Sequence, residues 1–257
     1  MIRSLTDLEL QAMLDGKARG GLSHSVVAHL RWDLRQILRM AVSKGAADRN
    51  AAEQLFIPKS APRSETRRMT VEEVKLFFSV LDLRERAVGG LAILAGLRPG
   101  EILALRRSSL VDGGFADIQQ RIYRSELDTP KSHKSRRLAA VGETLSGWLR
   151  EWVEMLPPTS EDWLFPSETM RTPVSRDNLW RRSFYPRLKK VGMGWANFQV
   201  MRRTHASLLG DLDVDPQVRA DQMGHGVSVN QNQYTKSGSR RKLDAVNRLQ
   251  RELGLAE

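Results

Sequence analysis

The sequence of 257 residues predicts a mostly α-helical protein with a small antiparallel β-sheet. Apolar residues recur at helical spacing over most of the chain, whereas residues 108–141 carry short apolar runs between turn residues, which is typical of paired strands. Residues 57–64 hold two prolines, two serines and two basic residues, a composition typical of an exposed linker. We therefore expect a short helical domain at residues 1–57, a linker at 58–69 and a larger mixed α+β domain at 70–257.

The first domain contains one amphipathic segment. Apolar residues follow i, i+4, i+7 and i+8 spacing at Leu30, Leu34, Ile37 and Leu38. This pattern predicts a helix over residues 25–43. The other side of that helix holds three arginines, Arg31, Arg35 and Arg39. Such a row suits contact with a phosphate backbone, and an ordinary solvated helix face explains it equally well.

The second domain opens on a helix signal. Thr70 and Glu73 form a Thr-x-x-Glu capping box ahead of a helical apolar pattern. That pattern consists of Val74, Phe77, Phe78 and Leu81. A second apolar segment, residues 87–97, stops before Pro99, whose ring is tolerated in the first turn of a helix. A new helix should therefore begin close to Glu101, which places Arg98 at a helix junction.

Two turn signals interrupt residues 108–141. Asp112–Gly114 and Asp128–Pro130 separate the short apolar runs, and the second turn places Lys131 in a hairpin. Two further helices are predicted after the sheet. The first rests on the spacing of Leu145, Trp148, Leu149 and Trp152, and the last on that of Leu243, Val246, Leu249 and Leu253.

Charge and composition narrow the class of partner. The chain has 41 Lys and Arg against 30 Asp and Glu, a net charge of +11 and a pI of about 10.4. This excess points to a polyanion such as DNA, although RNA or an anionic membrane surface would also suit it. No stretch approaches the roughly 20 apolar residues of a spanning helix, and residues 1–15 lack a signal-peptide core. We expect a soluble, cytoplasmic protein that does not act at a membrane.

The chain contains no cysteine. This excludes disulfides, thiolate metal sites and cysteine nucleophiles together. Any chemistry must therefore come from oxygen and nitrogen groups.

Four polar segments stand in order along the second domain and end on a tyrosine. They contain Arg98 and Glu101, then Lys131 and Lys134, then Gln199 and Arg202, and last His225 and Tyr234. A tyrosine hydroxyl has a pKa near 10. It therefore attacks phosphorus only where cations and hydrogen-bond donors stabilise the developing charge, and these segments supply such groups.

In order and spacing, these segments resemble the catalytic boxes of the tyrosine recombinase family, the phage-integrase type of site-specific recombinase. The resemblance covers roughly residues 70–240, and residues 35–50 more weakly resemble the end of the family's helical core-binding domain. It implies a core-binding domain at 1–57, short for this family, and a catalytic domain at 70–257. It also implies DNA strand transfer through a covalent 3′-phosphotyrosine, with no metal, ATP or other cofactor.

The resemblance also implies a role for each residue. Tyr234 would be the nucleophile, and Arg98 and Arg202 would clamp the equatorial oxygens of the transition state, for which guanidinium forks are suited. Lys131 would protonate the departing 5′ oxygen. Its interval to the basic pair at residues 136–137 favours it over Lys134, which remains an alternative.

Two supporting roles complete this set. His225 would donate a hydrogen bond to a nonbridging oxygen. Glu101 lies three residues after Arg98, on the same side of a helix, and would orient that guanidinium or a neighbouring donor. An ordinary ion pair on the helix surface is the alternative for Glu101.

One residue departs from the family pattern. Gln199 stands three residues before Arg202, where the family usually has histidine. Glutamine can donate a hydrogen bond but cannot take the proton of the tyrosine. General-base assistance, typically worth ~10²–10⁴-fold in rate, must then come from water, from a neighbouring group or not at all, so we expect a slow enzyme rather than a dead one. We expect His205 to pack or cap rather than to replace that base.

Three hypotheses follow. The first is a site-specific recombinase that binds double-stranded DNA recombination sites as a homo-oligomer, a synaptic tetramer, with a possible directionality factor. The second is a type IB topoisomerase, and the third a degenerate relative that binds site DNA without cleaving it. The residues around Arg98 and His225 favour the first, whereas Gln199 and the short first domain support the third. The resemblance also implies a prokaryotic, phage or mobile-element origin and a nucleoid-associated location.

Overall fold

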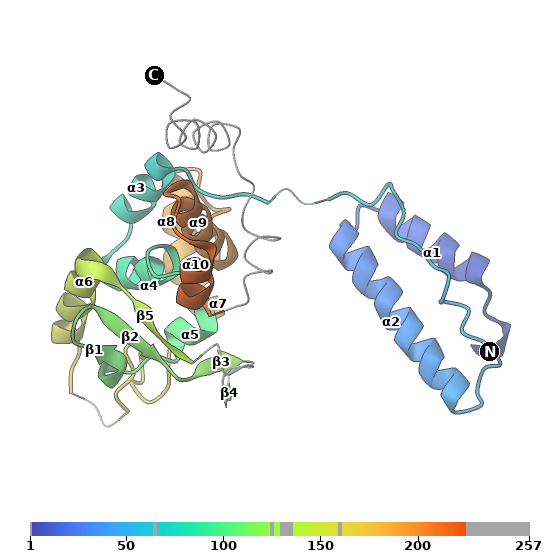
Figure 1. Ribbon diagram of the computed structural model, residues 1–257, viewed down its shortest axis with the longest axis horizontal. Coiled ribbons are helices and arrows are strands. Elements are labelled where there is room, and N and C mark those ends of the chain that lie inside the picture. Colours follow the sequence, from blue (N-terminus) through green and yellow to red (C-terminus); the bar gives the residue numbers. More distant parts are fainter. Residues whose placement is uncertain (1, 64–65, 124–125, 129–135, 159–160, 225–257) are drawn as a thin grey trace, which may run out of the picture. The chain divides into compact units, whose positions relative to one another are not determined.

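The computed structural model describes residues 2–63, 66–123, 126–128, 136–158 and 161–224 (Figure 1). Within these ranges the chain is mostly helical with two small antiparallel sheets, which confirms the predicted fold class. The chain divides into two compact units, Met1–Thr66 and Arg67–Glu257. The predicted last helix, with Leu243 to Leu253, lies outside the described residues.

The first unit is built on two helices, α1 (Asp7–Arg19) and α2 (His24–Ser43), after a short 3-10 turn at Ile2–Ser4. Thr6 and Glu9 cap α1 reciprocally, with hydrogen bonds of 3.2 Å from Glu9 N and 2.9 Å from Thr6 N. The core of this unit comes from both helices and the following turns: Leu10, Leu14, Ala18, Val27, Leu38, Ala51, Ala52, Leu55 and Ala61.

Helix α2 occupies the predicted range, but its buried stripe differs at one position. Val27 and Leu38 are buried, whereas Ile37 is 55% exposed. Adjacent residues lie about 100° apart around a helix, so a stripe centred on Leu38 leaves Ile37 at its edge and turned to solvent. The prediction that Ile37 belongs to the apolar face was wrong for this reason.

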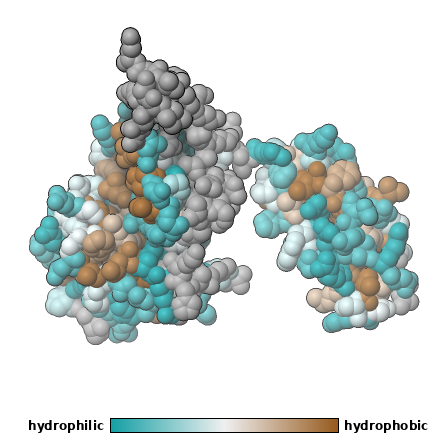
Figure 2. Space-filling view, viewed as in Figure 1, coloured by the Kyte–Doolittle hydropathy of each residue, from teal (hydrophilic) through white to brown (hydrophobic). Residues whose placement is uncertain are grey.

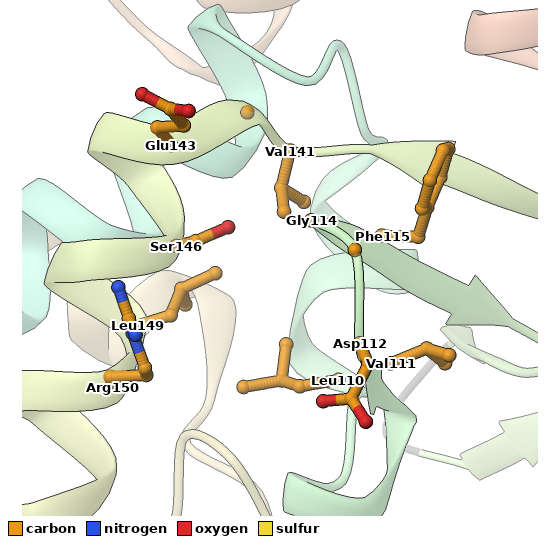
Figure 3. A pocket seen from close by; sticks show the side chains of 12 residues that line it. Leu110, Val111, Asp112, Gly114, Phe115, Val141, Glu143, Ser146, Leu149 and Arg150 are labelled. Atoms are coloured by element: carbon orange, nitrogen blue, oxygen red, sulfur yellow. The ribbon is translucent and has the colours of Figure 1, made fainter.

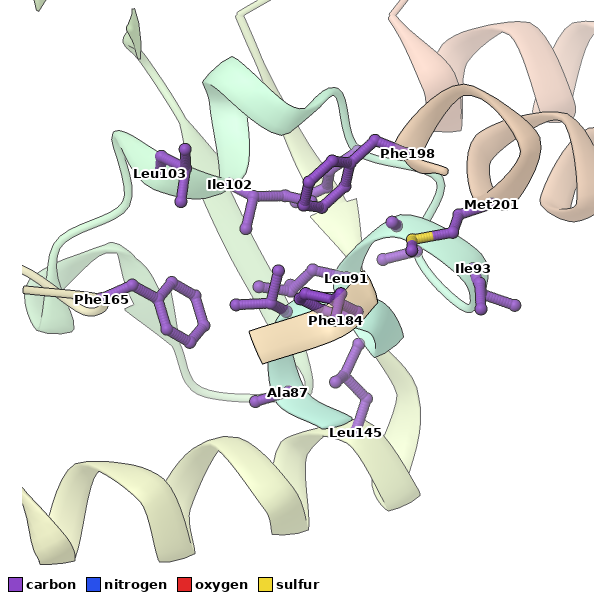
Figure 4. Packing of buried hydrophobic residues seen from close by; sticks show 14 of the residues in the cluster. Ala87, Leu91, Ile93, Ile102, Leu103, Leu145, Phe165, Phe184, Phe198 and Met201 are labelled. Carbon is purple, nitrogen blue, oxygen red and sulfur yellow. The ribbon is translucent and has the colours of Figure 1, made fainter. Parts of the chain in front are cut away.

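The second unit is organised around α4 (Leu83–Ile93), in which every residue from Ala87 to Ile93 is buried. It lies between α6 (Gly142–Met155) and α9 (Phe198–Asp211) and contacts both (Figure 1). A Cβ atom on Gly90 would approach Leu145 to 2.6 Å, so glycine allows α6 to pack closely. Leu91, Phe184 and Leu145 lie together in this core (Figure 4).

The helix before α4 starts as predicted. In α3 (Val71–Ser79), Thr70 N donates to Glu73 Oε2 at 2.8 Å and Glu73 N donates to Thr70 Oγ1 at 3.2 Å, which confirms the capping box. After α4, the chain turns at Gly96, whose φ of +69° favours glycine. Helix α5 (Pro99–Leu103) then begins with Pro99 in its first turn.

The strands form two sheets rather than one. In the first, β1 (Leu110–Val111), β2 (Phe115–Ile118) and β5 (Arg137–Ala140) are antiparallel in the order β1-β2-β5, with Asp117 opposite Leu138. The 3-10 turn η2 (Arg107–Ser109) precedes β1. The second sheet is the hairpin of β3 (Arg121–Tyr123) and β4 (Glu126–Asp128), with Arg121 opposite Asp128.

The remaining described segments are helical. One of them is formed by α7 (Arg176–Leu179), a π-helical stretch at Trp180–Phe184 and α8 (Tyr185–Lys190), which follow one another directly. Asn197 caps α9, and α10 (Pro216–Met223) ends at Gly224 in the left-handed conformation. Among the described helices, none has the length and apolarity of a membrane span.

The visible surface of both units is mostly hydrophilic, with scattered hydrophobic patches (Figure 2). In the first unit, the most exposed large apolar side chains are Leu8, Trp32, Ile37, Met40 and Phe56. Isolated apolar residues of this kind are normal on a protein surface and require no partner to explain them.

Candidate active site

Arg98 is held at the start of α5 by a single carboxylate. It occupies the N-cap position, and Glu101 stands three residues later. Glu101 Oε2 accepts a hydrogen bond from Arg98 N at 3.0 Å, and Glu101 Oε1 accepts one from Arg98 Nη1 at 2.8 Å. The i, i+3 spacing at a helix start therefore fixes both the backbone and the guanidinium. The Arg98 side chain remains 40% exposed and can still meet a ligand.

Glu101 is a buried residue, only 2% exposed. Besides Arg98, it accepts a hydrogen bond from Arg137 Nη2 at 3.1 Å. Burial alone raises the pKa of the Glu101 carboxyl, but the Arg137 guanidinium, and after it Arg98, more than offset this and hold that pKa below its usual value. Glu101 is thus an ionised group inside the protein, and the alternative of a surface ion pair does not describe it.

Arg202 is held by backbone carbonyl groups. It lies on α9, is 5% exposed, and its Nη1 donates to the Gly96 carbonyl. Its Nη2 donates to the carbonyl of Met223 at 2.6 Å. Arg98 Nη1 also donates to Met223 O, at 3.4 Å, and Arg98 Nη2 donates to Gly224 O at 3.2 Å. The carboxyl end of α10, which carries partial negative charge, therefore draws the two guanidinium groups together.

These two arginines border one open cavity of about 410 Å³. Gln199 lines the same cavity and is exposed, so the structure brings three of the predicted residues together. The remaining lining residues come from α5, α7, the π-helical stretch after it and the start of α9: Pro99, Arg176, Asp177, Trp180, Asn197 and Phe198. No group of three or more metal-binding side chains occurs among the described residues.

Gln199 and Arg202 share one face of α9. The Asn197 side chain caps this helix by accepting hydrogen bonds from Gln199 N at 3.0 Å and Val200 N at 3.1 Å. This cap places Gln199 in the first turn, and residues three apart on a helix lie on the same side. The side chain three residues before the second arginine therefore faces the cavity.

A larger cavity, of about 770 Å³, lies elsewhere in this unit (Figure 3). It opens between the β1–β2 turn and α6, with Phe115, Ser146 and Arg150 among its lining residues. It contains none of the predicted site residues. The candidate site is therefore distinguished by the two arginines that border the smaller cavity, and not by cavity volume.

His205 packs in the interior, as predicted. It is 4% exposed, and its Nδ1 lies 2.9 Å from the carbonyl oxygen of Ile93. Burial lowers the pKa of His205 to about 4, so the ring is neutral at pH 7 and its Nδ1–H donates to that carbonyl. A Cβ atom on Gly96 would come within 2.3 Å of the ring, which explains the glycine at this position.

Gly100 permits a close contact beneath Arg98. A Cβ atom at Gly100 would lie 2.5 Å from the carbonyl oxygen of Ile122 in β3. The first turn of α5 thus rests directly on the β3–β4 hairpin. This contact gives a physical reason for a glycine between Arg98 and Glu101.

Four predicted residues lie outside the described residues: Lys131, Lys134, His225 and Tyr234. Described residues adjoin these segments in the sequence. Gly224, the neighbour of His225, contacts Arg98, and Arg137 begins the strand that follows the predicted lysine hairpin.

Arg137 is the residue that sequence reasoning missed. In the sequence, Arg137 stands out only as one of two adjacent basic residues after the predicted lysine hairpin. Its side chain is 8% exposed and pairs with Glu101. Alternation along a strand was the available signal, because Arg137 shares a face of β5 with the buried Ala139, whereas Arg136 and Leu138 are exposed.

The arginines of α2 are arranged differently. Arg31 Nη1 donates to the carbonyl of Leu55 at 3.2 Å, and Arg35 pairs with Glu53. Both contacts tie the turns after α2 to the helix. Arg39 is exposed.

Comparison with known proteins identifies relatives of this architecture. Residues 67–241 match the model of the Phage integrase family. The Tn1549 transposon integrase, solved in complex with a circular intermediate DNA, is 15% identical with a TM-score of 0.81, over 96% of this chain and 86% of that chain. Among curated proteins no match is found.

Two further solved structures are similar. A lambda integrase dimer bound to a COC′ core site is 20% identical with a TM-score of 0.67, over 92% of this chain and 67% of that chain. XerA recombinase is 19% identical with a TM-score of 0.59, over 85% of this chain and 83% of that chain. At these identities the likeness shows a shared fold.

Proposed function

This chain belongs to the phage integrase family, the tyrosine recombinases, and on that premise we propose that it is a site-specific DNA recombinase. It cleaves and rejoins DNA strands through a covalent 3′-phosphotyrosine at Tyr234, without a metal or ATP. Residues 1–57 act as a short core-binding domain, 58–69 as a linker and 70–257 as the catalytic domain.

One observation carries this proposal. Arg98 and Arg202 each donate a hydrogen bond to the same carbonyl oxygen, that of Met223, and border one cavity. A phosphate that enters this cavity meets two permanently charged, planar donors at once. Such forks, held in place before the reaction, are well suited to the equatorial oxygens of a phosphorane-like transition state.

The reaction then proceeds in two transesterifications. The Tyr234 hydroxyl attacks phosphorus, the bond from phosphorus to the 5′ oxygen breaks, and Lys131 protonates that oxygen, with Lys134 as the alternative donor. In the second step, the 5′ hydroxyl of the partner strand attacks the phosphotyrosine and releases Tyr234. His225 donates a hydrogen bond to a nonbridging oxygen throughout, and Glu101 holds Arg98 in place.

Gln199 contributes a donor but no base. Its position on the cavity wall suits an amide hydrogen bond to a nonbridging oxygen. His205, one turn along α9, is buried against Ile93 and cannot take the tyrosine proton. That proton therefore passes to water, and cleavage is slower than in a relative with histidine at this position.

The partners follow from the same proposal. The substrate is double-stranded DNA carrying recombination sites, which the protein binds as a homo-oligomer and joins in a tetrameric synapse, with a directionality factor as a possible accessory. Arg31, Arg35 and Arg39 of α2 contact the DNA backbone. The protein works in the cytoplasm of a prokaryotic cell, at the nucleoid, as part of a phage or mobile element.

One alternative keeps specific support. Gln199 stands on the cavity wall where the family usually has its base, which favours a degenerate relative that binds site DNA and regulates recombination without cleaving it. A type IB topoisomerase would use the same groups but would relax DNA as a monomer without paired sites.

A trapping experiment tests the proposal. Duplexes from the sequence flanking the gene are screened by mobility shift, and the bound one is nicked to make a suicide substrate. Wild-type protein should give a covalent protein–DNA band on a denaturing gel, and Tyr234→Phe should not. DNA binding with no covalent band would contradict the recombinase proposal and favour the relative that binds DNA without cleaving it. Relaxation of supercoiled DNA lacking the site would support the topoisomerase.

A further inference from the structure

Arg137 contacts two parts of the candidate site, the Glu101 carboxylate and the carboxyl end of α10. Its Nη2 donates to Glu101 Oε2 at 3.1 Å, and its Nη1 lies 3.5 Å from Glu101 Oε1. Its Nε donates to the carbonyl of Gln222 at 2.8 Å. Strand β5 thus reaches both the carboxylate that orients Arg98 and the carboxyl end of α10.

Stability alone is a weak explanation for this ion pair. The side chains of Arg137 and Glu101 are 8% and 3% exposed. The desolvation cost of a buried ion pair often exceeds its Coulombic gain, and an apolar pair of similar volume is frequently as stable. A buried pair beside a reacting centre therefore calls for a second reason.

The charge balance around Glu101 supplies that reason. Both oxygens of Glu101 serve two arginines, because Oε1 accepts from Arg98 Nη1 and Oε2 from Arg98 N and Arg137 Nη2. Two guanidinium groups and one carboxylate leave a net charge of +1. Arg98 is the more exposed of the two arginines, so that charge is presented on the cavity side. Without Arg137, Glu101 would neutralise Arg98 directly.

Arg137 also shapes the end of α10. Gly224 ends this helix with φ of +64°, and a Cβ atom there would come within 2.5 Å of Arg137 Nη1. The side chain of Gln222 joins the same region to β5, since its Nε2 donates to Ala140 O at 2.8 Å and its Oε1 accepts from Ala140 N at 3.0 Å. The chain thus leaves α10 directly against the Arg137 guanidinium.

We propose that Arg137 is a positioning residue for strand cleavage. It neutralises Glu101 so that Arg98 keeps its charge for the DNA phosphate, and it fixes the turn from which the chain continues to His225 and Tyr234. This inference rests on the proposed recombinase function. Arg137 itself needs no contact with the DNA.

The test compares four variants of the full chain: Arg137→Met, Arg137→Lys, Glu101→Gln and the double variant Arg137→Met with Glu101→Gln. Single-turnover formation of the covalent complex is measured with saturating protein on the nicked suicide duplex. DNA affinity is measured separately in the Tyr234→Phe background, and folding by circular dichroism. Arg136→Met is the matched control, because it removes the same charge from the exposed neighbour.

Arg137→Met should slow cleavage by about 10²-fold, which is similar to the loss of an electrostatic donor. DNA affinity should change by less than about threefold, because the net positive charge changes by only one. Adding Glu101→Gln should recover about tenfold of that loss, because it removes the carboxylate that neutralises Arg98. Because removing the unpaired Glu101 carboxylate can also restore stability, circular dichroism must show that both variants are folded under the assay conditions. Arg136→Met should cleave at the wild-type rate.

The remaining outcomes decide between the two proposals. Wild-type protein that forms no covalent complex would overturn the recombinase function, and this assignment with it. If wild-type protein reacts and folded Arg137→Met reacts equally fast, only the assignment fails. A double variant as slow as Arg137→Met would overturn the neutralising role. If Arg137→Met does not fold, Arg137→Lys replaces it and should be intermediate, since one ammonium cannot reproduce the fork to Glu101 and Gln222.

Discussion

Two groups of arginines in this chain differ in what their hydrogen bonds accomplish. In the second unit, Arg98 and Arg202 converge on the carbonyl of Met223 beside an open cavity. On α2 of the first unit, Arg31 and Arg35 bind the following turns and Arg39 faces solvent. Residue type is the same in both places. The difference shows that an arginine becomes a candidate catalytic group when fixed neighbours orient it toward shared empty space.

Substitution of Arg202 should have the largest effect on cleavage. Arg202→Lys keeps the charge but cannot donate to Gly96 O and Met223 O in the same planar fork. Single-turnover cleavage should fall about 10²–10³-fold. The same change at Arg39 should leave that rate within about threefold of wild type, because a screened surface charge contributes little. Equal effects at the two positions would contradict the distinction drawn between them.

The pH dependence of the free energy of unfolding tests whether His205 is buried beside the candidate site. His205 has its pKa lowered to about 4 by burial, whereas an unfolded histidine titrates near 6.5. Between these values the unfolded state binds more protons, so stability is complete above about pH 6.5 and falls as the pH drops toward 4. The loss should approach about 1.4 kcal/mol per pH unit, or about 3 kcal/mol in total.

Urea unfolding of the full chain at pH 7 and pH 4.5 measures this difference. His205→Gln should be less stable at pH 7 but should lose much of the pH dependence. Glu101 acts at lower pH, because its lowered pKa means that its stabilising ion pairs are lost only as the pH falls below about 4.5. A wild-type stability that is flat between pH 6.5 and 4.5 would show that His205 is not buried as described.

Glycine substitutions test the packing of α5 beneath Arg98. Gly100→Ala would force a Cβ atom against the Ile122 carbonyl at 2.5 Å, so the free energy of unfolding should fall by about 1–3 kcal/mol. Gly147→Ala is the matched control, since nothing lies within 4 Å of its Cβ position in α6. It should raise stability by about 0.5–1 kcal/mol. Denaturant unfolding that ranks the two variants the other way would refute the close contact under Arg98.

The smallest effect is expected on α2. Arg39→Ala should weaken DNA binding by less than about tenfold, equally for site and non-site duplexes, and should reduce the slope of log affinity against log salt by about 1. Mobility shifts at several salt concentrations measure both quantities. Discrimination between sequences that changes with Arg39 would instead indicate contact with bases.

Local patterns were the most predictable part of this protein. Side chains a few positions apart were enough to predict the capping box of Thr70 and Glu73. The same holds for a helix start close to Pro99 and for the helix α6. Arg98 with Glu101 belongs to the same class, because the residue at an N-cap position and the residue three positions later lie close together at a helix start.

Contacts between distant segments were not predictable in the same way. Arg137 meets a carbonyl 85 residues away, and Gly100 in α5 lies against the Ile122 carbonyl of β3. Nothing in the neighbouring residues encodes either contact. The wrong prediction for Ile37 has a different cause. The buried stripe of α2 is narrow, and spacing alone does not decide whether a side chain at its edge is buried or exposed. Helix spacing gives the face of a helix but not its exact limits.

Identification of the residue that carries the DNA would test the tyrosine chemistry directly. The chain has three tyrosines, Tyr123, Tyr185 and Tyr234, so the trapped complex can be digested and the modified tyrosine located by mass spectrometry. We expect a 3′-phosphate linkage on Tyr234 and on neither of the other two tyrosines. An adduct on Tyr123 or Tyr185, or a bound complex with no adduct at all, would contradict this expectation.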